Sequence, residues 1–276
     1  MVLGEKSVIG VIHLPRIPRT TERVEHSLEE VVNRAVNEAR AFENEGFSGV
    51  IVENYGDSPY TKRVVDPLAI AAITVVVREV VRSVSIDVGV NILRNSGLEA
   101  YSIAYATGAK FVRVNALAET VVTDSGILEP EAVRIRSARI NYPGVRVYAD
   151  ILVKHGYGIA YVGALAESVA IGASIEDYIR NVVLDYIERA GADALIVTGM
   201  RTGEPPNVER LKVVKKFSTV PVLVGSGANP ENVVTLLKHS DGLIVGSYVR
   251  KDGKAGNPLD PVRLKDFARA VRAALV

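Results

Sequence analysis

Short apolar runs alternate with longer segments of helical spacing along the whole chain. Eight runs are apolar at most positions, and each ends at a turn or a polar residue. Such runs predict strands that are buried on both faces, as in a parallel sheet covered by helices. We expect these strands at 8–14, 49–54, 86–93, 110–115, 146–152, 194–199, 222–224 and 243–245.

Between the strands, apolar side chains recur every three or four residues, which predicts amphipathic helices. In the segment 27–45, Val31, Ala35, Ala39 and Phe42 share one helix face, and the next residue, Gly46, supplies a stop. Further long helices are expected at 66–81, 97–107, 129–141, 174–190, 207–217 and 261–275.

This alternation in one chain of 276 residues predicts a single-domain (β/α)8 barrel, the TIM-barrel fold, spanning residues 1–276. The sequences GFSGVIVEN, GAKFVRVN, GADALIVTG and SDGLIVGS place a small turn before strands two, four, six and eight. Their similarity indicates a repeated βαβα unit. A doubly wound open sheet is the alternative, but no GxGxxG follows the first strand, and that fold usually carries this fingerprint when it binds a dinucleotide.

The segment 153–173 is the longest interruption of the strand–helix pattern. It is rich in small and apolar residues, and its only acidic or basic side chains are Lys154, His155 and Glu167. Because it follows the fifth strand, it lies on the face where barrel enzymes carry their active sites. We expect a long loop there, acting either as a lid over the site or as a surface for oligomerisation.

Two glycine turns follow the last two predicted strands, within the stretch 221–247. Small side chains leave backbone N–H groups open to an anion, and the loops after strands seven and eight of a barrel frequently bind phosphate. A helix capped by Asn229 would also direct its N-terminus towards the first turn. Ordinary tight turns are the alternative. The predicted phosphate-binding residues are Gly225, Ser226, Gly227, Gly246 and Ser247.

Polar residues stand where the apolar strands end, which is where a barrel holds its functional side chains. Asp150 and Glu53 are carboxylates at strand ends, where partial desolvation tunes a pKa for acid–base chemistry. The same pair could hold a divalent metal ion, and Asp150 could instead orient a neighbouring cation. Strand-end hydrogen bonding is the structural alternative for each carboxylate. Arg113 lies inside the fourth strand and needs a buried partner, for which Asp150 and Glu53 are the candidates.

Two of the four histidines also fall at predicted strand ends. His155 follows Asp150 and could act as an acid or a base, whereas His13 precedes Pro15 and has a structural alternative. Lys154 could bind phosphate or form a Schiff base, although a loop lysine is more often only solvated. The predicted catalytic residues are Asp150, His155, Glu53 and Lys154, and the predicted substrate-binding residues are His13, Asn54, Asn91, Arg94, Asn115, Asp124 and Thr198.

Composition narrows the classes of partner. The chain has 33 Lys and Arg, 32 Asp and Glu, a formal net charge of +1 and no basic tract, which disfavours nucleic acid as its main partner. It has no cysteine, which excludes disulfides, thiolate metal sites and cysteine nucleophiles. No signal peptide and no apolar run of membrane-spanning length is evident, so the expected location is the cytoplasm.

The chain resembles the BtpA/SgcQ family over nearly its whole length. The resemblance rests on VIGVIHLP, GVIVENYGDSPY, VGVNILRN, RVNALAETVVTDSGI, DILVKH, GADALIVTGMRTGEPP and PVLVGSGANPENV, in that order. The chain departs from the family after Pro15, where Arg16-Ile17-Pro18-Arg19 replaces an expected turn richer in Pro and Gly. The matching motifs emphasise His13, Glu53, Asn54, Asp57, Asn91, Arg94, Asn115, Asp124, Asp150, Lys154, His155, Thr198, Gly203, Glu204, Ser226 and Gly246.

The resemblance implies a phosphate-binding TIM barrel without assigning it a reaction. One branch of the family is named for photosystem I biogenesis, and others are associated with sugar utilisation. We therefore expect an enzyme acting on a phosphorylated sugar-like or nucleotide-related metabolite, by isomerisation, lyase or glycosidic-bond chemistry. A phosphoribosylanthranilate-isomerase-like reaction is one version, although it would usually require a Cys or an equivalent acid. The alternative is a non-catalytic assembly factor that uses the barrel as a scaffold or ligand sensor, and a homo-oligomer is expected in either case.

Overall fold

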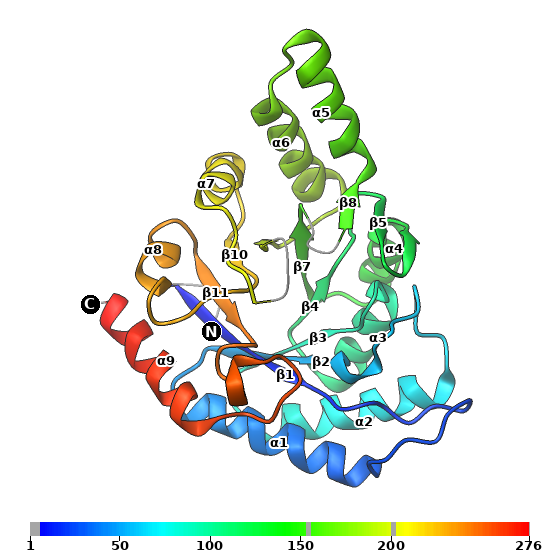
Figure 1. Ribbon diagram of the computed structural model, residues 1–276. Helices are drawn as coiled ribbons and strands as arrows, with labels where there is room; N and C mark the ends of the chain where they lie inside the picture. The colour runs from blue at the N-terminus through cyan, green and yellow to red at the C-terminus, as the bar shows by residue number, and fades with distance from the viewer. Residues whose placement is uncertain (1–5, 153–155, 200–202, 276) are drawn as a thin grey trace.

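Eight parallel strands close into a barrel in the computed structural model, which describes residues 6–152, 156–199 and 203–275 (Figure 1). Around the barrel the order is β1-β11-β10-β9-β7-β4-β3-β2, so the sequence-based prediction of a TIM barrel is confirmed. The barrel strands are β1 Ser7–His13, β2 Gly49–Glu53, β3 Asp87–Asn91, β4 Phe111–Val114, β7 Arg146–Ile151, β9 Ala194–Val197, β10 Val222–Val224 and β11 Gly242–Val245.

Helices surround the barrel and pack against the outer faces of its strands (Figure 1). Helix α1 begins where predicted, because Ser27 and Glu30 form a reciprocal capping box, and Asp66 caps α2 by accepting from the N–H of Ala69. The surrounding helices are α1 Leu28–Asn44, α2 Pro67–Ser83, α3 Gly97–Thr107, α4 Ala132–Asn141, α6 Ile175–Leu184, α7 Val208–Phe217, α8 Val233–Lys238 and α9 Pro261–Ala274. Short helical turns are η1 Tyr55–Asp57, η2 Asp185–Arg189 and η3 Lys251–Gly253.

Apolar side chains fill the barrel interior towards the amino ends of the strands. Phe111 and Tyr148 stack there with ring centroids 4.5 Å apart. Gly89 makes room for them, since a Cβ at this position would lie 2.3 Å from the Phe111 ring. Ile9, Ile51, Leu223 and Ile244 belong to the same cluster. With this end of the barrel packed, any internal space must open at the carboxyl ends of the strands.

The described residues of the segment 153–173 form a strand and a helix, so the prediction of an irregular loop is corrected. Strand β8 Gly156–Gly158 pairs with β5 Val121–Thr123, which pairs in turn with β6 Gly126–Leu128. Helix α5 Ile159–Ile171 follows and projects away from the barrel beside α6 (Figure 1). Its sequence, IAYVGALAESVAI, contains four alanines, which favour a helix. The role of this segment as a lid or an interface stays a prediction.

Helix α8 begins later than predicted. Asn229 does cap a turn, accepting from the N–H groups of Glu231 and Asn232, but the regular helix starts only at Val233 and is six residues long. Its N-terminus therefore contributes less to an anion site than a full helix would. Within the described part of the chain, no helix is both long and apolar enough to cross a bilayer.

Candidate functional site

A cavity of about 260 Å³ opens at the carboxyl ends of the barrel strands. Its walls come from the ends of β1, β2 and β4, from the loops after β2 and β3, from the tip of the β5–β6 hairpin, and from the turns after β9, β10 and β11. The described lining residues that carry the arguments below are His13, Glu53, Tyr55, Tyr60, Arg94, Arg113, Asn115, Asp124, Gly203, Gly225, Ser226, Gly227, Gly246 and Ser247.

The turn after β10 supplies open backbone N–H groups, but not from Gly225. The Gly225 N–H donates to Val197 O at 2.8 Å and belongs to the sheet, whereas the N–H groups of Ser226 and Gly227 make no backbone hydrogen bond within the described chain. A Cβ on Gly225 would lie 2.4 Å from Ile196 Cγ2. Gly225 is therefore needed for close packing, and its two neighbours present the donors.

One hydrogen bond and one close backbone approach hold this turn. Ser226 Oγ donates to Glu204 O at 2.9 Å, which ties the turn to the loop after β9. Gly227 has φ +75°, and a Cβ there would lie 2.0 Å from Pro205 N. Only glycine combines that dihedral with that close approach. The turn is thus a rigid part of the cavity wall.

The turn after β11 meets β1 at the same wall. A Cβ on Gly246 would lie 3.1 Å from His13 Cε1 and 3.2 Å from Nε2, so the glycine lets the imidazole approach. His13 Nδ1 accepts from the Gly256 N–H at 3.2 Å, and the neutral imidazole therefore carries its proton on Nε2. Nε2 lies 3.9 Å from Glu53 Oε1.

Burial and the Glu53 carboxylate both raise the pKa of Tyr55, whose ring packs against His13 with centroids 4.5 Å apart. Glu53 and His13 are themselves only 8% and 5% exposed. An imidazole and a carboxylate in this arrangement can exchange a proton with a ligand in the cavity.

Arg113 and Asp150 form a buried ion pair beside these groups, as the position of Arg113 in a strand predicted. Arg113 Nη2 lies 3.0 Å from Asp150 Oδ1, Nε donates to the same carboxylate, and Asn115 Nδ2 donates to Oδ2 at 2.6 Å. Burial lowers the pKa of Arg113, but Asp150 and Glu53 more than offset this and raise it overall. The guanidinium is a fixed cation at the floor of the cavity.

Arg94 stands on the wall formed by the loop after β3. Its guanidinium lies over the Tyr60 ring, 5.1 Å from the centroid, and Nη2 pairs with Asp124 Oδ1 at 2.8 Å. Burial is the largest cause of a raised pKa for Tyr60, and the Glu53 carboxylate adds to it. The Tyr60 hydroxyl donates to Tyr55 O at 2.8 Å. The loop after β2 is thereby joined to the Arg94 wall.

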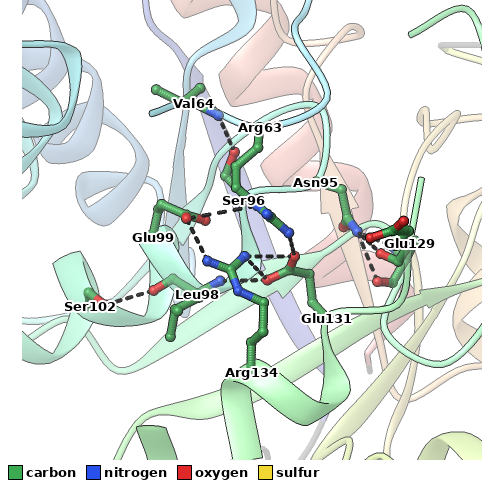
Figure 2. Close-up of polar contacts among 11 residues, drawn as sticks. Arg63, Val64, Asn95, Ser96, Leu98, Glu99, Ser102, Glu129, Glu131 and Arg134 are labelled. Atoms are coloured by element: carbon green, nitrogen blue, oxygen red, sulfur yellow. Dashed lines mark hydrogen bonds and ion pairs between the residues drawn. The ribbon is translucent and has the colours of Figure 1, made fainter. Parts of the chain in front are cut away.

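A buried polar network anchors the base of this wall (Figure 2). Glu131, which is 0% exposed, accepts from Arg63 and Arg134 and from the N–H of Leu98. Asn95, next to Arg94, donates to Ala116 O and to Glu129 O. The network fixes the loop after β3 to helices α3 and α4, so Arg94 projects from a rigid support.

Three of the predicted substrate-binding residues, Asn54, Asn91 and Thr198, are not among the described lining residues of the cavity. Asn54 donates to Asp57 and accepts from the N–H of Leu93. Asn91 Nδ2 donates to Arg113 O at 2.9 Å. Asn91 Oδ1 and Thr198 Oγ1 are buried without a hydrogen-bond partner within the described chain, which leaves one polar atom on each for a water molecule or a ligand atom.

The structure thus brings most of the predicted site residues together. Asp150 contacts the cavity through Arg113 and Asn115, which line it, rather than being one of its described lining residues. Lys154 and His155 lie outside the described residues. Sequence reasoning missed Tyr55 and Tyr60 as lining residues. Their position just after the second strand end is the signal that would have found them.

Of Glu53 and Asp150, the two carboxylates considered as metal ligands, Asp150 already pairs with protein donors. Asp150 already accepts from Arg113 and Asn115, and a metal ion would have to displace a guanidinium. Among the described residues, no group of three or more His, Asp or Glu side chains is arranged to hold a metal ion.

A second cavity of about 470 Å³ lies at the base of α5. Its wall includes the Glu119 carboxylate, which accepts from the Tyr178 hydroxyl at 2.8 Å and lies 3.5 Å from the Tyr186 hydroxyl. Burial raises the pKa of Glu119, and the two hydroxyl contacts oppose the rise without cancelling it.

The fold and the first cavity define a TIM-barrel protein with polar side chains and glycine turns gathered at one barrel mouth. The chain belongs to the BtpA family, whose model matches residues 4–273. It is 39% identical to an uncharacterized protein of Pyrococcus horikoshii over 99% of this chain and 98% of the relative. It is 36% identical to the photosystem I biogenesis protein BtpA of Synechocystis, over 97% of this chain and 88% of that protein.

Solved structures share the fold at low sequence identity. N-(5'-phosphoribosyl)anthranilate isomerase from Pyrococcus furiosus superposes with a TM-score of 0.58 at 17% identity, over 97% of this chain and 99% of the isomerase. At that identity the likeness establishes the barrel and not the reaction.

Proposed function

We propose that this protein is an enzyme that binds a small phosphorylated, sugar-like metabolite at the barrel mouth and moves a proton on it. The observation that carries the proposal is that one cavity is lined both by the two glycine turns and by the His13–Glu53 pair. An anchor and a proton-transfer pair in the same cavity are the parts that an isomerase or a lyase of this kind requires.

The phosphate would bind the N–H groups of Ser226, Gly227 and Ser247, which make no backbone hydrogen bond within the described chain. These donors add to an anion site of the kind that barrels carry after strands seven and eight. A cavity of about 260 Å³ suits a sugar phosphate better than a dinucleotide, because pockets for larger ligands reach several hundred Å³ or more. Phosphate binding would hold the reacting end of the ligand in place.

At the reacting end, His13 Nε2–H can donate to a carbonyl or hydroxyl oxygen, while the Glu53 carboxylate accepts a proton from carbon or oxygen. Arg113, held by Asp150, stabilises negative charge that develops on the ligand. Asp150 acts here by orienting Arg113 and Asn115. Roles for Lys154 and His155 in the same chemistry, and a lid over it, stay predictions.

A non-catalytic role is the second candidate, and one observation favours it. Helix α5 has no buried residue, and Val169 and Ile171 are 84% and 80% exposed. A helix with exposed apolar side chains is suited to contact another protein, as in an assembly factor or a homo-oligomer. A protein with that role would keep its contacts when Glu53 and His13 are replaced.

Binding is tested by thermal shift with ribose 5-phosphate against ribose. We expect only the phosphorylated compound to raise the Tm, and Ser247→Asp to abolish the rise by placing a carboxylate beside the phosphate. Ser102→Asp, on the exposed face of α3, is the matched control and should respond as the unsubstituted chain does. An equal response of both variants would overturn the phosphate site.

Chemistry is tested by NMR in D2O with the sugar phosphates that bind. We expect deuterium to enter the carbon next to the carbonyl in the presence of the unsubstituted protein. Glu53→Gln should keep the thermal shift and lose the exchange, because it retains the shape of the side chain and removes the base. Unchanged exchange in Glu53→Gln would remove Glu53 from the mechanism.

A further inference from the structure

Arg94 and the glycine turn after β10 face each other across the barrel mouth. In the ring order β1-β11-β10-β9-β7-β4-β3-β2, strands β3 and β10 are separated by four positions in either direction and are therefore diametrically opposite. Arg94 follows β3, Gly225 follows β10, and both line the same cavity. A ligand whose phosphate lies against the 225–227 turn directs its other end towards Arg94.

Arg94 is held in place before any ligand binds. Its backbone N–H donates to Thr61 O at 3.1 Å, its guanidinium lies over the Tyr60 ring, and its side chain is only 12% exposed. Nε is buried and has no hydrogen-bond partner within the described chain. The Arg94 guanidinium is therefore fixed and has an unused N–H donor, which suits the binding of a planar anion such as a carboxylate.

The counter-ion of Arg94 is replaceable. Asp124 stands at the tip of the β5–β6 hairpin and its side chain is 67% exposed, so the ion pair gains little from burial. Arg113, by contrast, is neutralised by Asp150, whose side chain is 2% exposed. Of these two lining arginines, Arg94 is the one that can exchange its carboxylate partner for a ligand without leaving a buried charge unpaired.

We propose that Arg94 binds a carboxylate at the end of the ligand remote from the phosphate, and that the substrate class is a phosphorylated carboxylic acid. This inference rests on the proposed phosphate site. Asp124 occupies the carboxylate position in the free protein and leaves Arg94 when the ligand binds. A neutral sugar phosphate, which cannot replace Asp124, binds through its phosphate alone.

Two matched ligand pairs test the proposal, each differing in one terminal group. They are 3-phosphoglycerate with glycerol 3-phosphate, and 6-phosphogluconate with glucitol 6-phosphate; titration calorimetry gives the Kd of each. We expect the acid of at least one pair to bind on the order of tenfold more tightly than its alcohol, the range for a charge-assisted hydrogen bond. A bisphosphate of glucitol is a third arm, and tighter binding of it than of the acid would assign a second phosphate instead.

Variants separate the two ends of the ligand. Arg94→Gln should remove the preference for the acid and leave the alcohol unchanged, and Asp124→Asn should strengthen binding of the acid alone by removing its competitor. Arg82→Gln, whose side chain is 66% exposed on α2, is the control and should keep the preference. Equal binding of acid and alcohol to the unsubstituted protein overturns this inference while the phosphate site stands. An unchanged Kd for every compound in Ser247→Asp would overturn the phosphate site. If no compound binds at millimolar concentration, both the phosphate site and the carboxylate site at Arg94 are overturned.

Discussion

The barrel mouth and helix α5 break the usual pattern of burial in opposite directions. At the mouth, polar side chains are buried: Glu53 is 8% exposed, Asn115 7% and Asp150 1%. On α5, apolar side chains are exposed, as Val169 and Ile171 show. Both departures are informative, because folding alone favours neither. Buried polar groups at the mouth support the proposed ligand site, and a contact surface on α5 stays a prediction.

The two regions also differ in how tightly their residues are constrained. At the mouth, the Asp150 carboxylate is held by Arg113 and Asn115, and Gly225 and Gly227 are enclosed by neighbouring atoms. On α5, a Cβ added to Gly163 would meet nothing within 4 Å. Substitutions should therefore destabilise the protein strongly at the mouth and weakly or not at all on α5.

The largest effect is expected at the buried ion pair. Arg113→Met should lower the free energy of unfolding by about 3–5 kcal/mol, because it leaves the Asp150 carboxylate buried with only Asn115 as a partner. Urea unfolding measures the change. The double variant Arg113→Met, Asp150→Asn removes the stranded charge and should recover much of the loss. No recovery would mean that packing, not charge, dominates at this position.

A smaller loss is expected for Gly227→Ala. The left-handed conformation alone costs about 1–2 kcal/mol, and the clash with the Pro205 backbone adds about 1–3 kcal/mol. Gly46→Ala is the control, since Gly46 has φ +84° but an added Cβ would meet nothing within 4 Å. Urea unfolding of Gly46→Ala should therefore show only the conformational cost. Equal losses of unfolding free energy in the two variants would contradict the enclosed geometry of the turn at Gly227.

At the base of α5, Glu119 predicts a pH dependence. Its raised pKa means that the folded state favours the protonated carboxyl, so its contribution to stability is present below the unfolded pKa of about 4.3 and is lost as pH rises through the folded value. The unsubstituted protein should lose stability relative to Glu119→Gln as the pH rises above about 4.3. Thermal unfolding at a series of pH values measures this difference, with the exposed Glu167→Gln variant as the control. Parallel curves of Tm against pH for the unsubstituted protein and both variants would contradict the burial of the Glu119 carboxylate.

The smallest effect, and the only gain, is expected on α5 itself. Gly163→Ala should stabilise the protein by about 0.5–1 kcal/mol, because alanine is the better helix former and has open space there. Urea unfolding again gives the value. A loss instead of a gain would mean that Gly163 lies against a neighbouring surface in solution, such as a second copy of the chain.

The barrel could be predicted from sequence because each strand is an apolar run at most positions and ends at a turn or a polar residue. The need of Arg113 for a buried counter-charge could be predicted too, with Asp150 and Glu53 as the candidates, and the structure pairs it with Asp150. Strands β5, β6 and β8 could not, because they are three residues long and gain their pairing from one another. The start of α8 was misplaced because the Asn229 turn precedes the helix without joining it.

The sequence predicted where the residues of the candidate site lie, but not what each of them does there. Strand ends identified His13, Glu53 and Arg94, but no sequence pattern shows that the Gly225 N–H belongs to the sheet or that Asp150 is held by Arg113. Those facts depend on the register of neighbouring strands and on side chains that come from different strands. Of the roles expected for Asp150, its contacts with Arg113 and Asn115 favour the orientation of a neighbouring cation, and its catalytic role stays a prediction.

A crystal structure of the protein with a bound phosphorylated acid, such as 6-phosphogluconate, is the most direct measurement of the central claim. We expect phosphate oxygens about 2.7–3.2 Å from the backbone nitrogens of Ser226, Gly227 and Ser247, with the rest of the ligand beside His13 and Glu53. A phosphate bound elsewhere, for example in the cavity at the base of α5, with the barrel mouth holding only water, would contradict it.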